Sequence, residues 1–314
     1  MNRTKRSISL KIQALVTSLL LLVCQPSFAT CLYNDFEGWK DCFIKDKLSH
    51  RLNSVDIDTL RQASFIPKVI DFDKKQPEKK LTFAGYQKLI NLPQKTKDAR
   101  AFYLQHKSLI NSISSEYSVE GSVIVALLTM ESNLGKVQGN FNIIDSLATL
   151  SYEGRRRAFF EKELINALTI SKIEGIDYDS FKGSWAGAMG QCQFMPSSFL
   201  AYAVDHDGDG VKDIWGSHED ALASAANYLA SNGWKYGKTQ INKLSSKDAA
   251  QIKADCSKNK TICKINENFN LIKLEDEDTI SNFKSGTNFD VLMKWNRSKY
   301  FVIAVLKIAN SIAD

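Results

Sequence analysis

Residues 123–135 read Val-Ile-Val-Ala-Leu-Leu-Thr-Met-Glu-Ser-Asn-Leu-Gly, an apolar run with a single acid, Glu131. Leu127, Glu131 and Leu134 are spaced as i, i+4 and i+7, which predicts a helix with the carboxyl group on its apolar side, near the glycine that ends it. Burial raises the pKa of a carboxyl group toward the range of a general acid. The alternative interpretation is a structural glutamate paired with one of the arginines at 155–157.

The stretch 183–198 reads Gly-Ser-Trp-Ala-Gly-Ala-Met-Gly-Gln-Cys-Gln-Phe-Met-Pro-Ser-Ser. Its glycines and other small residues suit a loop whose backbone approaches a ligand closely. Ser184, Gln191 and Gln193 are then its hydrogen-bonding side chains. A tight structural turn before a helix that starts at Pro196 is the alternative.

Residues 205–213 read Asp-His-Asp-Gly-Asp-Gly-Val-Lys-Asp and match the start of an EF-hand calcium loop. The bidentate Glu expected at the end of such a loop is replaced by Gly216, so Glu219 or Asp220 has to supply that ligand. Three close carboxylates repel one another unless a cation lies among them. We therefore expect a structural calcium site here, with no cofactor required for chemistry. A solvated acidic turn is the alternative.

Aromatic and amide side chains gather toward the end of the chain. They are Tyr228, Trp234, Trp295, Asn296, Tyr300 and Phe301. Aromatic faces beside amides suit stacking on sugar rings, but the same residue types are also typical of a core.

Residues 1–29 have the features of an export signal: basic residues, an apolar run over 12–23 and a small-x-small cleavage site that ends at Ala29. The apolar run is too short to span a bilayer as a helix. We expect cleavage after Ala29 and no transmembrane segment in the mature chain. Lipidation at Cys24, which would anchor the chain to the outer membrane, is the alternative.

The cysteines after the leader number five, and an odd number leaves at least one thiol without a partner in the chain. The short-loop pairs are Cys31 with Cys42 and Cys256 with Cys263, which leaves Cys192 free. Export would place these pairs in an oxidising compartment. The spacings fit no zinc site, and the chain has only 4 histidines.

The chain composition is that of a globular protein. It is 44% hydrophobic and 24% charged over 314 residues, which excludes disordered, collagen-like and polytopic membrane proteins. The net charge is +6, but residues 1–29 hold four bases and no acid, so the remainder carries only +2. This balance argues against a nucleic-acid partner.

The helical patterns predict one catalytic domain over 30–314. Helices are expected at 97–117, 119–134, 156–174, 196–204, 218–232 and 298–313, with short helices within 35–66. The proline-containing stretch 67–94 is expected to be loop with one short strand. Residues 236–286 are expected to form a small β-containing insertion beside a helical core over about 97–235.

Taken in order, these segments resemble the membrane-bound lytic murein transglycosylase B family. The resemblance rests on M-E-S-N-L-G-K at 130–136, N-I-I-D-S-L-A-T-L-S at 142–151, the 183–198 stretch, A-V-D-x-D-G-D-G-x-x-D-I-W at 203–215 and W-N-R-S at 295–298. It covers roughly residues 35–310. It implies a mainly α fold: a lysozyme-like helical core with a small β-containing subdomain and an EF-hand-like loop.

The resemblance also implies an activity: cleavage of the β-1,4 bond between N-acetylmuramic acid and N-acetylglucosamine in the periplasm of a Gram-negative bacterium, leaving a 1,6-anhydromuramoyl end. Glu131 is implied as the single catalytic acid and base. The residues implied to line the sugar cleft or to lie near the glycan are Ser184, Gln193, Tyr228, Asn296, Tyr300, Arg156 and Arg157. Those implied for the metal loop are Asp205, Asp207, Asp209, Val211 through its carbonyl, and Asp220.

This sequence departs from the family pattern at two places. Cys192 replaces a proline or glycine just before Gln193, which puts a thiol close to the expected cleft. Phe301 stands where the family usually has a tyrosine, with Tyr300 one step earlier. One residue turns a helix face by about 100°, so the structure has to decide which ring faces the site.

No second carboxylate is evident beside Glu131, although glycosidases normally use two. Asp145, the nearest acid along the chain, is expected to cap a helix. A single carboxyl group suffices if it protonates the glycosidic oxygen and then takes the proton of the muramic 6-hydroxyl. A muramidase and a non-catalytic peptidoglycan-binding protein are the alternatives. We expect peptidoglycan strands and other cell-wall enzymes as partners, and a monomer.

Overall fold

The computed structural model describes residues 31–48, 54–75, 81–252, 262–266, 269–275 and 280–313. Its α-helices are α1 Phe36–Phe43, α2 Ser54–Gln62, α3 Pro67–Lys74, α4 Phe83–Leu89, α5 Leu92–Gln105, α6 Lys107–Tyr117, α7 Gly121–Ser132, α8 Ile143–Glu153, α9 Arg157–Ile173, α10 Pro196–Tyr202, α11 His218–Ser231, α12 Ser246–Ile252, α13 Asn288–Trp295 and α14 Lys299–Ala313. The π-helix η1 Ile44–Leu48 and the 3-10 helix η2 Tyr178–Ser180 are short. The strands are β1 Phe141–Asn142, β2 Lys182–Gly183, β3 Ile241–Leu244, β4 Ile262–Asn266, β5 Phe269–Glu275 and β6 Ile280–Gly286.

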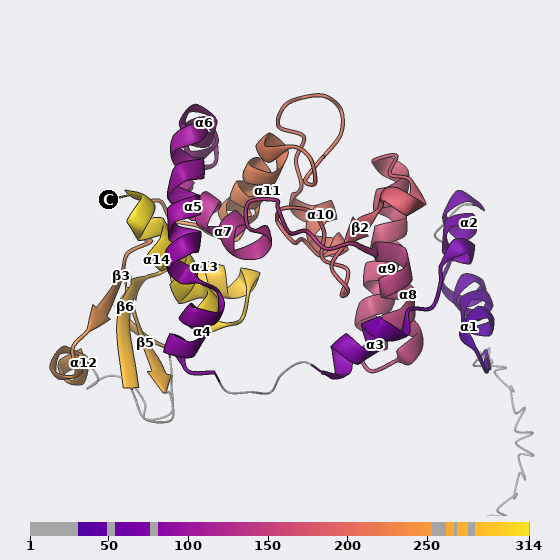
Figure 1. Cartoon of the computed structure of the whole chain (residues 1–314), viewed down its shortest axis with the longest axis horizontal. Coiled ribbons are helices and arrows are strands. Elements are labelled where there is room, and N and C mark those ends of the chain that lie inside the picture. Colours follow the sequence, from indigo (N-terminus) through magenta and orange to yellow (C-terminus); the bar gives the residue numbers. More distant parts are fainter. Residues whose placement is uncertain are drawn as a thin grey trace, which may run out of the picture.

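Helix α7 is the centre of the core. Its residues from Val123 to Leu128 are fully buried, and α14, α5, α11 and α6 pack around it (Figure 1). A helix that is apolar on every side has to be enclosed in this way. The apolar run that contains Glu131 is therefore surrounded by other helices.

Two groups of elements flank this core. On one side, α8 packs along α9, with α1 and α3 against α8 and α2 against α9. On the other side, strands β3, β6, β5 and β4 form an antiparallel sheet in that order, and α14 and α12 contact it. The mainly α, lysozyme-like fold with a small β-containing part is the fold that the sequence predicted.

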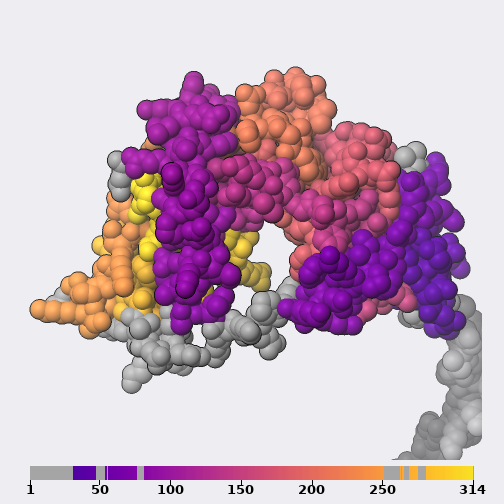
Figure 2. All heavy atoms as spheres, in the orientation of Figure 1, coloured from indigo at the N-terminus to yellow at the C-terminus, as the bar shows by residue number. Residues whose placement is uncertain are grey.

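The space-filling view shows a deep hollow between the two groups (Figure 2). Helix α7 and the chain after it lie above the hollow, α4 and α5 border one side, and α3 borders the other. We call this space the hollow. The last turn of α7, which contains Glu131, lies over it.

The described parts of stretch 67–94, residues 67–75 and 81–94, are mainly helical and contain no strand, so the expectation of loop with one strand is wrong there. Pro67 is the first residue of α3 and Pro93 lies in the first turn of α5, where a missing backbone N–H costs nothing. Thr82 caps α4 by accepting a hydrogen bond from the N–H of Gly85 at 3.0 Å. Pro67 and Pro93 therefore lie where helices begin and do not interrupt them.

The expected helix at 97–117 is two helices that begin earlier. α5 starts at Leu92, and the chain breaks at His106, where φ is −108° and ψ is 24°, before α6 begins. Asp145 does not cap α8 as expected. The cap is Asn142, whose side chain accepts the N–H of Asp145 at 3.0 Å, while Asp145 accepts the N–H of Ser64 and the hydroxyl of Tyr178.

Candidate active site

Glu131 is a partly exposed carboxyl group at the end of a buried helix. The helix stops because Asn133, Leu134 and Gly135 have φ values of 53°, 60° and 82°, a left-handed run that a helix cannot continue through. The sequence prediction of a carboxyl group near a glycine stop is correct in this respect. Glu131 therefore lies in the last turn of α7, directly before this left-handed run.

The indole N–H of Trp295 donates a hydrogen bond to Glu131 Oε1 at 2.7 Å. Burial raises the pKa of Glu131 to about 7, although this hydrogen bond and the positive charge of Lys95 each act to lower it. A carboxyl group with such a pKa can both give and take a proton near neutral pH.

The alternative of a glutamate paired with nearby arginines is wrong. Arg155 and Arg156 both bind the buried carboxylate of Asp73, at 2.7 and 2.8 Å. Arg157 stacks on the ring of Tyr33 and hydrogen-bonds its hydroxyl group. These arginines therefore hold α3 and the N-terminal segment to the α8–α9 turn.

Aromatic rings line the side of the site near Trp295. The ring centroid of Tyr228, on α11, lies 4.7 Å from that of Trp295, and Phe194 lies 5.3 Å from Trp295. Tyr228, a predicted substrate residue, is half-buried, and burial raises its pKa. The structure therefore brings Tyr228 and Glu131 to the same indole ring.

Tyr300 and Phe301 lie on different faces of α14. Phe301 is only 5% exposed and belongs to the core, whereas the Tyr300 ring lies 5.7 Å from that of Tyr86. Burial raises the pKa of Tyr86 to about 12, and the negative charge of Glu131 adds to this effect. Of the two rings, Tyr300 is therefore the one that lies next to Tyr86, and its role as a substrate residue stays a prediction.

Tyr86 and Lys95 are site residues that the sequence analysis did not identify. Both interact electrostatically with Glu131, and both lie in or next to the stretch that was assigned to loop. The Thr82 cap followed by Phe83 and Tyr86 at i and i+3 was the signal that could have found α4 and placed Tyr86 on it.

Residues 183–194 form a compact turn that we call the 183–194 loop. Met189 makes antiparallel bridges with both Gly183 and Phe194, so the chain folds back on itself. A side chain at Gly183 would come within 2.3 Å of the carbonyl oxygen of Ala188, so only glycine fits there. The interpretation of a tight structural turn is confirmed, and that of a ligand loop stays a prediction.

Ser184 and Gln193 stabilise the loop through hydrogen bonds to its backbone. Ser184 Oγ accepts the N–H groups of Ala186 and Ala188 at 3.3 and 2.9 Å, which leaves its own proton to donate. Gln193 Nε2 donates to Gln138 and Gly190 carbonyls at 3.1 and 2.9 Å. Its Oε1 is then the atom that it can offer to a ligand.

Gln191 is not a ligand-facing residue as expected. It is 1% exposed, and its Nε2 donates to the carbonyls of Trp215 and Ser217 at 3.3 and 3.2 Å. These bonds identify Oε1 as the acceptor for His218 Nδ1 at 2.8 Å. Gln191 therefore joins the 183–194 loop to the start of α11.

The remaining predicted substrate residues are occupied in the fold. Asn296 ends α13, and its Oδ1 accepts the N–H of Ser298 at 3.0 Å. Arg156 also lies over the Phe160 ring at 4.8 Å. Both side chains are partly exposed, so these contacts fix their orientation without enclosing them.

The thiol of Cys192 is fully buried and free, and its Sγ contacts the carbonyl oxygen of Ala221 at 3.1 Å. Burial, with a smaller contribution from the charge of Glu131, raises its pKa far above the usual value. The thiol is close to the carboxyl group, as expected, but it is neutral and shielded.

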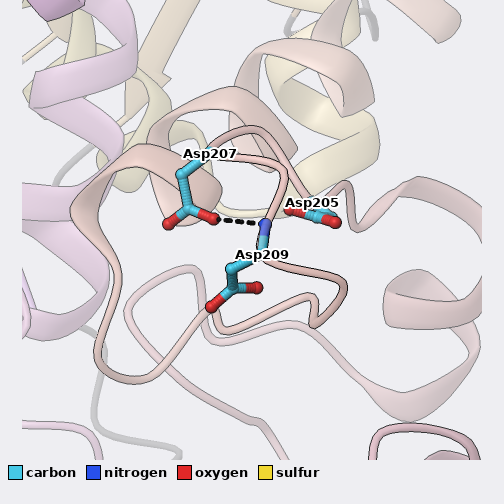
Figure 3. A group of neighbouring side chains, drawn as sticks. All are labelled: Asp205, Asp207 and Asp209. Carbon is cyan, nitrogen blue, oxygen red and sulfur yellow. Dashed lines mark hydrogen bonds between the residues drawn. The ribbon is translucent and has the colours of Figure 1, made fainter.

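The acidic loop before α11 brings three carboxylates together (Figure 3). Ligand oxygens of Asp205, Asp207 and Asp209 lie within 4.8 Å of one another. Asp220, also predicted as a ligand, accepts the backbone N–H groups of His206 and Asp213 at 2.7 and 2.8 Å, and its role as a ligand stays a prediction. Oxygen donors in this arrangement suit calcium. Figure 1 places the loop on the side of α10 and α11 away from the hollow.

Cys31 and Cys42 form a disulfide, as the sequence predicted. The predicted Cys256–Cys263 pair and the leader 1–29 lie outside the described residues. In the ranges that the structure describes, no helix combines the length and apolar character that a membrane span needs.

A mainly helical fold in which a carboxyl group with a raised pKa lies beside a cluster of aromatic rings is typical of the lysozyme-like class. Residues 35–310 match the family model of the transglycosylase SLT domain, and the chain belongs to this family.

The chain is 30% identical over 242 residues to membrane-bound lytic murein transglycosylase B of Escherichia coli. That alignment spans 73% of this chain and 66% of the relative, just under two thirds of its length. SltB3 of Pseudomonas aeruginosa, solved in complex with NAG-NAM-pentapeptide, superposes with a TM-score of 0.79 at 32% identity, covering 90% of this chain and 80% of SltB3. The Escherichia coli lytic transglycosylase Slt35 in complex with calcium gives 0.70 at 28% identity, covering 88% and 92%.

Proposed function

We propose that this chain is a lytic transglycosylase that cleaves the β-1,4 bond between N-acetylmuramic acid and N-acetylglucosamine in peptidoglycan without consuming water. The observation that carries the proposal is Glu131: one carboxyl group with a pKa of about 7 that is hydrogen-bonded to Trp295, whose ring packs against Tyr228 and Phe194. In the part of the chain that the structure describes, the groups that act on its pKa are Trp295 and Lys95, and neither is a carboxylate. Family membership supports the same activity.

The reaction needs a single acid and base. Protonated Glu131 donates its proton to the glycosidic oxygen, and the C1–O bond breaks. The N-acetyl group of the muramic acid stabilises the cationic C1, and the Glu131 carboxylate accepts the proton of the muramic 6-hydroxyl. The 6-oxygen then attacks C1 to close the 1,6-anhydro ring, and Glu131 has regained its proton. Such an intramolecular attack benefits from proximity that a bulk water lacks.

The remaining predicted site residues have supporting roles in this proposal. Ser184, Gln193, Tyr228, Asn296 and Tyr300 would orient the sugars, and Arg156 and Arg157 would lie near the glycan and its peptide stem. Asp205, Asp207 and Asp209, with the Val211 carbonyl, would hold a structural calcium ion that takes no part in the chemistry. We further propose an exported, periplasmic monomer that acts on glycan strands together with other cell-wall enzymes.

Product mass separates this function from that of a muramidase. We expect purified protein to digest sacculi to muropeptides about 18 Da lighter than those of a hydrolase, because no water is added. Mass spectrometry of the digest measures the difference directly. Reducing-end products would establish the muramidase alternative.

The Glu131→Gln variant is the matched control. It keeps the size and a hydrogen-bonding oxygen for Trp295 but cannot transfer the proton. We expect activity to fall by a factor of about 10² to 10⁴ with an unchanged circular dichroism spectrum. Activity within threefold of the wild type would reject the assigned role of Glu131.

A further inference from the structure

Lys95 reaches from α5 to the end of α7. The last carbonyl groups of a helix lack partners within the helix. At the end of α7, the N–H of Leu134 turns back to the carbonyl of Leu128 at 3.1 Å, and the carbonyl of Thr129 accepts a hydrogen bond from Lys95 Nζ at 2.7 Å. Thr129 is two residues before Glu131. The Lys95 ammonium group is therefore attached to the turn of helix that contains Glu131.

Lys95 is partly buried, which is costly for an ammonium group unless it has partners. Burial lowers the pKa of Lys95, while the negative charges of Asp98 and Glu131 act to raise it. Asp98 lies one turn further along α5, and Gln94 holds its carboxylate through a hydrogen bond of 2.8 Å. The two carboxylates thus offset part of the effect of burial on the pKa of Lys95.

We propose that Lys95 is a positioning residue of this reaction: its ammonium group holds the C-terminal turn of α7 in place and keeps a positive charge beside Glu131. The proposal rests on the proposed function, in which the Glu131 carboxylate forms and is neutralised once in every cycle.

Two features of the site disfavour the ionised form of Glu131. Glu131 is partly buried, and it lies at the C-terminal end of a helix, where the carbonyl dipoles place a partial negative charge. The indole N–H of Trp295 and the positive charge of Lys95 act in the other direction and stabilise the ionised form. Tyr86 from α4 and Cys192 from the 183–194 loop also interact with Glu131, but burial keeps both neutral. Among the described groups that act on its pKa, Lys95 is thus the cation.

Removing the charge should make Glu131 a weaker acid. In the proposed reaction kcat/KM falls as pH rises through the pKa of Glu131, because the protonated form starts the cycle. We call this decrease the alkaline limb of the pH profile. For Lys95→Met we expect the alkaline limb to shift to higher pH by about half a pH unit or more. We also expect kcat at pH 6 to fall about three- to tenfold, with KM unchanged because Lys95 does not touch the substrate.

Two matched variants separate charge from packing. Lys95→Arg keeps the positive charge and should leave the alkaline limb close to that of the wild type. Lys40 also binds the end of a helix, since its Nζ donates to the carbonyls of Arg61 and Ala63 at 2.9 Å each, but it lies in the N-terminal segment. Lys40→Met should lower the melting temperature without moving the limb. An unmoved limb in Lys95→Met, or an equal shift in Lys95→Arg, overturns the proposal.

A titration without substrate distinguishes failure of this proposal from failure of the proposed function. Carboxyl ¹³C chemical shifts of glutamate-labelled protein, with Glu131 assigned through Glu131→Gln, give its pKa directly. We expect the pKa to rise in Lys95→Met, and also in Lys95→Gln, which serves if the methionine variant does not fold. If the wild type fails to digest sacculi, the proposed function is wrong, but this titration still tests the role of Lys95. An unchanged pKa of Glu131 in the Lys95 variants would reject that role.

Discussion

Glu131 holds its proton more tightly in the folded chain than it would in the unfolded chain, because burial raises its pKa from 4.5 to about 7. Folding therefore favours the protonated form. The contribution of this group to stability is complete below pH 4.5, declines as the pH rises to about 7 and is constant above it.

Glu131→Gln, which cannot ionise, should consequently be more stable than the wild type at pH 8, by about 1–3 kcal/mol, and nearly equal to it at pH 4. Urea unfolding at the two pH values measures both differences. A stability gain that is the same at pH 4 and pH 8 would show that ionisation of Glu131 is not its source.

Single residues were predictable from the sequence where local spacing decides their position. The i, i+4, i+7 pattern placed Glu131 on a helix near its end, and the helix does end there. Gln191 and Arg156 were not predictable in the same way, because their partners, Ser217 and Asp73, are distant along the chain. An exposed-looking polar side chain in a sequence can be satisfied entirely by such contacts.

Helix α3 depends on one buried carboxylate. Asp73 is 3% exposed, and although burial alone would raise its pKa, the hydrogen bonds and charges of Arg155 and Arg156 hold it below the usual value. This stabilisation is present above the pKa of the unfolded chain, about 3.8, and is lost as the pH falls through the lower native value.

We expect Asp73→Asn to reduce the free energy of unfolding at pH 7 by about 1–3 kcal/mol, since the amide cannot satisfy two guanidinium groups. Chemical denaturation gives the value, and the difference from the wild type should shrink below pH 3.8. Asp71→Asn, an exposed site on the same helix, is the control and should change stability by less than about 0.5 kcal/mol. Equal losses in the two variants would contradict this account.

Elements were predictable where hydrophobic periodicity is strong, and this holds for α7, α9, α11 and α14. The stretch that contains α3 and α4 was not, because its helices are short and its prolines were interpreted as breaks. Short helices are stabilised mainly by tertiary contacts. For α3 the decisive contact is the arginine pair on Asp73, which lies about 80 residues away in the sequence.

At the scale of the whole molecule, the acidic loop connects α10 to α11, and α11 contributes Tyr228 to the site. Asp220 in the first turn of α11 already binds the backbone of the loop, so an ion among Asp205, Asp207 and Asp209 would brace the same helix. A ligand that binds only the folded chain stabilises it by about 2.7 kcal/mol at a hundredfold excess over its dissociation constant.

We expect millimolar calcium, compared with chelator, to raise the melting temperature of the wild type but not that of Asp207→Ala/Asp209→Ala. Affinity should be weak, about 10⁻⁴–10⁻³ M, because the Glu that usually completes the loop is missing. Turnover of sacculi at a temperature well below unfolding should be the same with and without calcium. An equal rise in both proteins would place the ion elsewhere, and no rise in either would leave only an acidic turn.

The buried thiol of Cys192 gives the 183–194 loop a built-in reporter of its motion. A thiol reagent can reach this sulfur only when the loop separates from Ala221 on α11, so each modification marks one local opening. The labelling that is present in the wild type and absent in Cys192→Ala therefore counts these openings at a position close to Glu131. Glycan that binds across the loop should slow that labelling in proportion to its occupancy, so substrate affinity becomes measurable on an enzyme that has not turned over.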